Sequence, residues 1–146
     1  MAKIEITAAI YKPIEKVFSV ASNEELRPTW SRFTLEAQKI SDGPIGLGTA
    51  WRTVDKVFGR QIERQSVFTE YVPNKRITQE SRSGPVPFTV RWELEPISGG
   101  TRVKVIAEAQ PKGLIRFFGP LMMSIRKRQF ERDLANMKKL IEDEIL

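Results

Sequence analysis

Apolar and polar residues alternate along most of the chain, and this two-residue period is typical of β-strands that bury one face. The first alternating run covers residues 4–10, and six more follow from residue 33 onwards. Short turns separate the later runs, which favours antiparallel pairing because a parallel pair needs a long crossover. The expected strands are 4–10, 33–38, 49–57, a long strand from the turn at 58–60 to residue 72, 76–82, 88–95 and 103–107.

Two of these strands indicate what the sheet encloses. Residues 88–95 have one wholly apolar face, made of Phe88, Val90, Trp92 and Leu94. In residues 76–82, Ile77 shares its face with Gln79 and Ser81. If Ile77 points inward, two small polar groups therefore point inward with it.

The long strand that ends at residue 72 does not keep one parity. Ile62, Phe68 and Val72 fall on one face of a regular strand, whereas Val67 and Tyr71 fall on the other. The pattern therefore predicts a β-bulge in this strand and leaves its inward-facing residues open.

Helical spacing replaces the strand pattern between the first and second strands. Apolar residues recur at intervals of three and four, at Ile14, Val17, Phe18 and Ala21. Pro13 fits the start of this helix, where its missing N–H is not needed. Asn23 fits as the cap of a second short helix over residues 24–26, which Pro28 interrupts before Trp30.

A long helix is expected from Pro120 to near the C-terminus, and its apolar residues form two stripes. The first stripe contains Phe118, Leu121, Met122 and Ile125, and the second contains Met123, Phe130, Leu134, Met137 and Ile141. The stripes are rotated by roughly a third of a turn at 100° per residue. We therefore expect the two halves of the helix to cover different surfaces, or the helix to bend.

The order of elements is strand, two short helices, six antiparallel strands and one long C-terminal helix. An antiparallel sheet can bury one face against such a helix and leave the other face polar. The sequence therefore predicts an α+β fold in which a curved seven-stranded antiparallel sheet wraps around the C-terminal helix. The chain has 146 residues without an internal repeat or linker, so we expect a single domain over residues 1–146.

Composition narrows the chemistry. Cysteine and histidine are absent, which excludes disulfides, thiol catalysis, Cys/His zinc sites and triads that need imidazole. We expect no metal and no cofactor. Residues 1–6 lack the apolar stretch of a signal peptide, and no apolar run approaches the length of a membrane span. We therefore expect a cytoplasmic protein with no integral membrane segment.

The net charge is +6, and eight basic residues lie between Lys112 and Lys139. A helix with a basic outer face explains this number without a polyanion, and no RRM, KH or zinc-finger signature accompanies it. We therefore expect no nucleic-acid partner. The alternative is salt-sensitive binding of RNA or protein through the basic helix, at Arg126, Lys127 and Arg128.

Five segments, spread over nearly the whole chain, are similar to motifs of one superfamily. They are Pro13-Ile14-Glu15-Lys16-Val17-Phe18, Trp30, Gly46-Leu47-Gly48-Thr49, residues 67–77 (VFTEYVPNKRI) and Gly99-Gly100-Thr101-Arg102-Val103. Through these segments the chain resembles the START-like, or SRPBCC, superfamily of helix-grip proteins, and within it the polyketide cyclase/dehydrase-type group. None of the five segments is a catalytic motif.

The resemblance implies a helix-grip fold with a cavity between the sheet and the C-terminal helix that holds an apolar or amphipathic molecule. On this basis the expected cavity-lining residues are Trp30, Trp51, Gln79, Ser81, Phe88, Trp92, Phe118, Met122 and Ile125. The second stripe of the long helix is then expected to hold the fold. The expected partner is a small hydrophobic ligand, and a homodimer is left open.

Two functions fit this resemblance. The first is non-covalent binding of a lipid, polyketide or similar molecule, which is favoured because the sequence concentrates no reactive residues. The second is a cyclase/dehydrase-type enzyme that acts on a polyketide-like substrate. Without histidine or cysteine its acid–base groups would come from Asp, Glu, Lys, Tyr or Arg. The nearest candidates are Arg52, Glu63 and Tyr71, and no catalytic residue is assigned.

Overall fold

The computed structural model describes residues 2–57, 59–84, 86–109 and 119–146. Their strands form one antiparallel sheet in the order β1-β7-β6-β5-β4-β3-β2. The strands are β1 (Ala2–Ile10), β2 (Thr34–Lys39), β3 (Ala50–Val57), β4 (Arg60–Val72), β5 (Arg76–Ser83), β6 (Phe88–Ile97) and β7 (Gly100–Ala109). The helices are α1 (Ile14–Ala21), the 3₁₀ helix η1 (Glu24–Leu26), α2 (Arg27–Trp30) and α3 (Gly119–Glu142).

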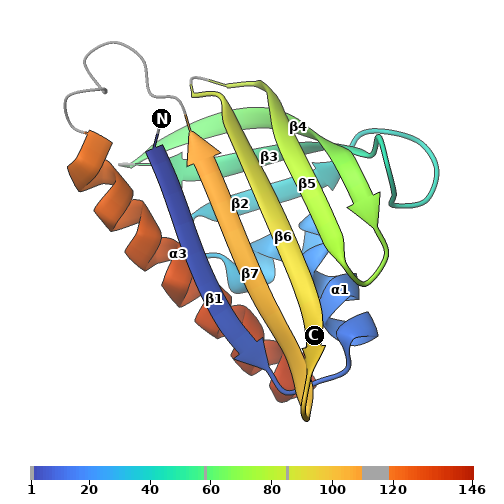
Figure 1. Ribbon diagram of the computed structural model, residues 1–146. Coiled ribbons are helices and arrows are strands. Elements are labelled where there is room, and N and C mark those ends of the chain that lie inside the picture. Colours follow the sequence, from blue (N-terminus) through green and yellow to red (C-terminus); the bar gives the residue numbers. More distant parts are fainter. Residues whose placement is uncertain (1, 58, 85, 110–118) are drawn as a thin grey trace.

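The sheet is strongly curved, and the helices lie on its concave side. Figure 1 views it from the convex side, with β2 and β3 crossing behind the front strands and α3 running behind β1. α3 packs on β1, α1 packs on β6 and β7, and η1 and α2 pack on β2. The predicted α+β architecture is therefore confirmed: a seven-stranded antiparallel sheet grips a long C-terminal helix, with two short helices between strands one and two.

Inward-facing residues form rows across the sheet. Trp92 on β6 is the register partner of both Ile77 on β5 and Val105 on β7, and Val105 pairs in turn with Ile6 on β1. All four side chains are buried. The next row, on the opposite face, contains charged residues such as Glu93 and Lys104. The alternation in the sequence is thus the alternation between the core and the outer surface.

β4 contains the predicted bulge. Its register against β5 shifts between Gln65 and Ser66 and again between Phe68 and Glu70. Ser66 and Phe68 face inward, and after the second shift Tyr71 pairs with the inward-facing Ile77. The bulge therefore brings the aromatic rings of Phe68 and Tyr71 to the same side, with a centroid separation of 6.2 Å.

β2 departs from a regular alternation. The sequence pattern groups Leu35 with Phe33 and Ala37, but a register shift between Thr34 and Glu36 breaks the strand. Thr34 is buried and Leu35 is exposed. The physical reason is polar: the Thr34 hydroxyl donates a 2.9 Å hydrogen bond to the buried carboxylate of Asp55 on β3.

The connection between β1 and β2 follows the sequence prediction at its caps. The Asn23 side chain accepts a hydrogen bond from the backbone N–H of Glu25, which caps η1. Pro28 does not interrupt this helix. It lies in the first turn of α2, where no intrahelical N–H is required. Trp30 ends α2 and is buried.

The glycines of two motif segments have specific backbone roles. Gly48 has a φ of +83°, and its N–H donates to the carbonyl of Phe68, which ties the turn before β3 to β4. A Cβ on Gly100 would lie 2.4 Å from the carbonyl oxygen of Ile10. Only glycine therefore allows the start of β7 to lie this close to the end of β1.

The second stripe of α3 forms the contact with the sheet. Phe130, Leu134, Met137 and Ile141 are all buried in the core. Of the first stripe, Leu121 and Ile125 are exposed, while Phe118 and the Met122 side chain lie outside the described residues. The Met123 side chain lies outside them as well. Within the described residues no helix combines the length and the apolar character that a bilayer crossing requires.

We predict that Leu134→Ala lowers the free energy of unfolding by about 2–5 kcal/mol, because it leaves a cavity beneath α3. Leu121→Ala, the same change at an exposed position of the same helix, is expected to stay within about 0.5 kcal/mol of the wild type. Urea unfolding followed by circular dichroism measures both values. Equal losses in the two variants would contradict the assignment of the second stripe as the core contact.

Candidate functional site

The concave face of the sheet contains polar groups among its apolar side chains. Gln79 on β5 is buried and faces inward beside Ile77. Its side-chain nitrogen donates a 2.6 Å hydrogen bond to the hydroxyl of Ser66 on β4, which is buried as well. The sequence predicted that Gln79 and Ser81 point inward if Ile77 does. Gln79 does so, while Ser81 is half-buried nearer the end of the strand.

Two buried tryptophans have no acceptor for their indole N–H groups. The Nε1 atoms of Trp30 and Trp51 are fully enclosed, and no acceptor in the described part of the chain bonds to them. Trp30 packs edge-on against Trp92 at 6.1 Å, and Trp51 packs against Phe68 at 5.5 Å. A buried donor without an acceptor costs roughly 1–3 kcal/mol. The interior therefore offers hydrogen-bond donors that the surrounding protein does not use.

A layer of charged residues is formed by η1, α2, β3, β4 and the middle of α3. It contains three arginines, Arg27, Arg64 and Arg126, and three buried carboxylates, Glu24, Asp55 and Asp133. The two sets come from five elements in three segments that are far apart in the sequence, residues 24–27, 55–64 and 126–133. The layer is therefore a product of the fold and not of a local motif.

Asp55 on β3 holds one side of this layer. Its carboxylate accepts from the Thr34 hydroxyl at 2.9 Å and from the Arg64 guanidinium at 3.1 Å. The Nε atom of Arg64 is buried and has no acceptor in the described residues. Burial lowers the pKa of Arg64, although the neighbouring Asp55 acts to raise it. The Arg64 guanidinium thus remains only partly satisfied.

Arg27, at the start of α2, is the best compensated of the three arginines. It bonds to Glu24 at 3.2 Å, and its guanidinium lies 5.5 Å from the centre of the Trp30 ring. Burial alone would lower the pKa of Arg27, but Glu24, Asp55 and Asp133 together outweigh it and raise the pKa.

Arg126 on α3 is half-buried and turned toward the layer. Its guanidinium lies 4.4 Å from the centre of the Phe33 ring, a cation–π contact. Burial and then the nearby Arg64 lower the pKa of Arg126 to about 10. In the described part of the chain no carboxylate lies within ion-pair distance of it.

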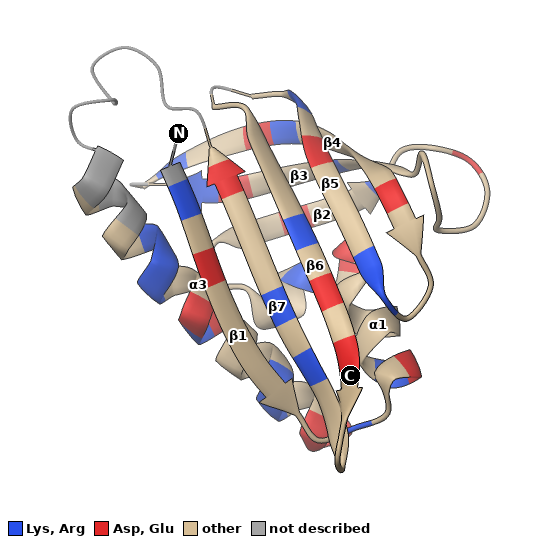
Figure 2. Ribbon diagram, in the orientation of Figure 1, with Lys and Arg blue, Asp and Glu red and all other residues tan. Residues whose placement is uncertain are grey.

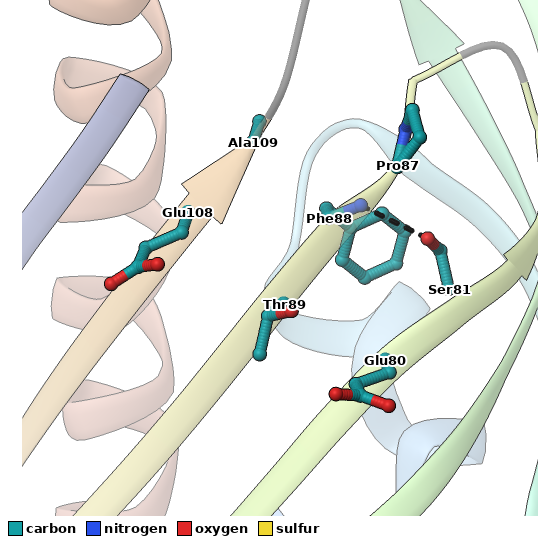
Figure 3. Close-up of a pocket in the computed structure, with 7 residues that line it drawn as sticks. All are labelled: Glu80, Ser81, Pro87, Phe88, Thr89, Glu108 and Ala109. Atoms are coloured by element: carbon teal, nitrogen blue, oxygen red, sulfur yellow. Dashed lines mark hydrogen bonds between the residues drawn. The ribbon is translucent and has the colours of Figure 1, made fainter. Parts of the chain in front are cut away.

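A pocket of about 310 Å³ opens at the end of β5, β6 and β7. It is lined by Glu80, Ser81, Pro87, Phe88, Thr89, Glu108 and Ala109. Figure 3 shows the Phe88 ring beside Ser81, whose hydroxyl accepts a 2.9 Å hydrogen bond from the Phe88 backbone N–H. The Arg64 guanidinium lies 5.3 Å from the centre of the Phe88 ring. The pocket wall is therefore in contact with the charged layer.

The nine residues expected at a cavity lie in different surroundings. Ser81 and Phe88 line the pocket, whereas Trp30, Trp51, Gln79 and Trp92 are buried on the concave side of the sheet. Ile125 is exposed on α3. Phe118 and the Met122 side chain lie outside the described residues. The structure thus brings two of the nine to the pocket and four to the buried concave face. The pocket also includes Glu80, Thr89 and Glu108, which form one cross-strand row on the outward face.

The residues considered for acid–base catalysis do not meet at one site. Arg52 and Glu63 pair with each other at 2.7 Å, and both are solvent-accessible. Tyr71 lies on the other side of the sheet, edge-on to Phe18 at 5.4 Å. In the described ranges each buried carboxylate has a hydrogen-bond donor, and no group of three metal-ligating residues is close enough to hold an ion.

The charged layer was not predicted from the sequence, because a charged residue is normally expected at the protein surface. Arg126 stands in a basic run with Lys127 and Arg128, and only the last two are exposed. One signal was present: on strands of period two, Arg64 shares its parity with Ser66, and Asp55 shares its parity with Trp51. Trp51 and Ser66 both face inward, so Asp55 and Arg64, which lie on the same faces of their strands, also point into the interior.

Charges on the convex face behave as the alternation predicts. Figure 2 shows acidic and basic residues distributed along the strands, with both signs on neighbouring strands. Cross-strand pairs such as Lys104 with Glu5 at 3.1 Å and Arg102 with Glu95 at 2.6 Å are solvent-accessible. Such pairs contribute little to stability, and they distinguish this face from the buried layer.

Comparisons with known proteins agree with the observed fold. Residues 1–142 match the family model described as polyketide cyclase/dehydrase and lipid transport. No curated protein matches the chain. Solved structures with the same fold include a protein of Thermus thermophilus (TM-score 0.83, 17% identity, 95% of this chain and 96% of that one). They also include the Zhui aromatase/cyclase of Streptomyces sp. R1128 (0.81, 14%, 99% and 95%) and a START superfamily protein of Mycobacterium smegmatis (0.76, 17%, 99% and 97%).

These structural likenesses are at low sequence identity and describe the fold, whereas the family model covers almost the whole chain and describes the sequence. The motif segments that suggested the START-like superfamily lie within the matched residues. The chain therefore belongs to the family described as polyketide cyclase/dehydrase and lipid transport.

Proposed function

We propose that this protein, as a single domain over residues 1–146, binds a small amphipathic molecule such as a lipid or polyketide between the concave face of its sheet and α3. The observation that carries the proposal is the pair of enclosed indole N–H groups, of Trp30 and Trp51, that lack an acceptor in the described residues. Buried donors are nearly always paired in folded proteins. A ligand with carbonyl, hydroxyl or carboxylate oxygens would supply the acceptors.

The surroundings of these donors suit the apolar part of such a ligand. Trp92, Phe68 and Val90 contribute apolar surface to the same side of the sheet. Ala107 and Phe88, one row apart on β7 and β6, are only half-buried although both face inward. Ligand sites are typically apolar with a few fixed polar groups, which is the composition of this face.

The descriptions of the relatives support the class of ligand. The family is described by both cyclase/dehydrase activity and lipid transport. Its structural neighbours include a START superfamily protein and an aromatase/cyclase. Both descriptions concern apolar or amphipathic molecules, so they support a hydrophobic ligand without choosing between transport and chemistry.

A cyclase/dehydrase-type enzyme is the second candidate, and it rests on the same donors. Enclosed N–H groups can stabilise an enolate oxygen that develops during a cyclisation. Acid–base catalysis also needs a titratable group that is free to exchange a proton. Among the described residues, Glu24, Asp55 and Asp133 are each engaged by a hydrogen-bond donor. We therefore favour binding over catalysis.

A neutral fluorescent probe tests the proposal directly. We expect N-phenyl-1-naphthylamine to bind the purified protein with stoichiometry near one and to quench the emission of the buried tryptophans. Native mass spectrometry of the same protein is expected to detect an apolar molecule retained from the host. A protein that retains no such molecule and binds neither this probe nor a panel of lipids would overturn the proposal.

We predict that Ala107→Phe lowers the affinity for the neutral probe by about tenfold or more, because a ring at this inward position occupies the space that the ligand needs. Ile106→Phe is the matched control, since residue 106 precedes it on the outward face of β7. This control is expected to bind the probe like the wild type. Equal affinities for the wild type and both variants, measured by fluorescence titration, would place the probe elsewhere.

A further inference from the structure

The charged layer contains one arginine that lacks a carboxylate partner in the described part of the chain. Glu24 bonds to Arg27, and Asp55 bonds to Arg64. The third carboxylate, Asp133, accepts from the Ser31 hydroxyl at 2.7 Å and from the Arg32 backbone N–H at 3.2 Å. It is therefore engaged away from the arginine side chains.

Arg126 and Arg64 are linked through one short chain of contacts. Arg126 lies 4.4 Å from the Phe33 ring, and the next residue, Thr34, donates to Asp55 at 2.9 Å. Asp55 in turn accepts from Arg64 at 3.1 Å. The positive charge of Arg64 also lowers the pKa of Arg126, as expected of two neighbouring cations. Each guanidinium lies over an aromatic ring, Phe33 for Arg126 and Phe88 for Arg64.

Both guanidiniums have unused hydrogen-bonding capacity. Among the residues that the structure describes, the enclosed Nε atom of Arg64 has no acceptor, and Arg126 makes no ion pair. A guanidinium presents several N–H donors in a fixed planar fork. Two partly satisfied forks beside each other repel unless an anion lies between them.

We propose that Arg64 and Arg126 bind the carboxylate of an amphipathic ligand whose apolar part lies against Phe33 and Phe88. This assignment rests on the proposed function and specifies the class of ligand. A carboxylate matches the guanidinium fork in two parallel hydrogen bonds. The aromatic rings beneath the two arginines offer apolar surface within a few ångströms of the charge.

The direction of Arg126 distinguishes this site from a surface for polyanions. Arg126 is turned toward Phe33, whereas Lys127 and Arg128 are exposed on the outside of α3. A nucleic acid or an anionic membrane would contact the two exposed residues first. A carboxylate inside the fold would contact Arg126 and leave the other two unaffected.

The experiment compares two probes that differ only at the head group. Dodecanoate and dodecan-1-ol have the same chain length, and isothermal titration calorimetry measures both affinities at pH 8. We expect the wild type to prefer dodecanoate by about tenfold or more, because hydrogen bonds to charged groups discriminate by about that factor. Arg126→Gln is expected to lose this preference while it binds dodecan-1-ol like the wild type.

Arg128→Gln is the matched control, because it removes the same charge from an exposed position on the same helix. It is expected to keep the preference for dodecanoate. Arg64→Lys provides a second variant that retains a cation beside Asp55 and loses the planar fork. We expect it to weaken dodecanoate binding with little change for dodecan-1-ol.

The ligand-free protein gives an independent readout. Burial and the neighbouring Arg64 and Arg27 lower the pKa of Arg126, and the opposing effect of Asp55 and Asp133 is smaller. Folding therefore disfavours the charged form of Arg126. The free energy of unfolding of Arg126→Gln should therefore equal or exceed that of the wild type at pH 8.

Several outcomes would overturn the assignment. Equal affinity of the wild type for both probes would show that the protein binds apolar chains without recognising a carboxylate. A preference for dodecanoate that persists in Arg126→Gln, with a lower free energy of unfolding, would show that Arg126 is structural. If neither dodecyl probe binds although N-phenyl-1-naphthylamine does, the carboxylate site fails and the proposed function stands. If none of the three binds, both fail.

Discussion

The curvature of the sheet is the constraint on which the interior depends. A single helix, α3, packs on β1 at one edge, and the short helices pack on β2 at the other edge and on β6 and β7. Aliphatic side chains make up most of the core between the sheet and these helices. Large aromatic side chains from opposite elements also meet there, as Trp30 meets Trp92 and Trp92 meets Phe130. Because indole and guanidinium groups carry N–H donors, an interior filled in this way is also rich in donors.

The fold was largely predictable because its elements follow from local patterns. Strand alternation, the Asn23 cap and the core stripe of α3 all depend on spacings within a few residues. The bulge in β4 was predictable as well, because the apolar residues of a regular strand would otherwise fall on both faces, although the inward-facing residues were not assigned. The bulge in β2 was not predicted, because it depends on a hydrogen bond from Thr34 to a residue on another strand.

The candidate site was predictable only in part. Trp92 lies on the wholly apolar face of its strand, and the inward direction of Gln79 follows if Ile77 points inward. The direction of Arg126 cannot be derived from the sequence pattern, because a charged residue in a basic helical run normally faces solvent. Its position depends on Phe33, which comes from a segment more than ninety residues earlier. Long-range contacts of this kind decide which charges a fold buries, and no periodicity encodes them.

The two edge strands of the sheet affect how the molecule behaves in solution. β1 and β2 are the edge strands, and exposed edges can pair with strands of other molecules. Lys138 of α3 donates to the carbonyl of Ala9 on β1, and Glu142 accepts from the N–H of Tyr11 just beyond it. At the other edge, the irregularity that turns Thr34 inward also breaks the straight run of β2. The helix that closes the interior and the bulge that positions Asp55 thus also protect the sheet against edge-to-edge association.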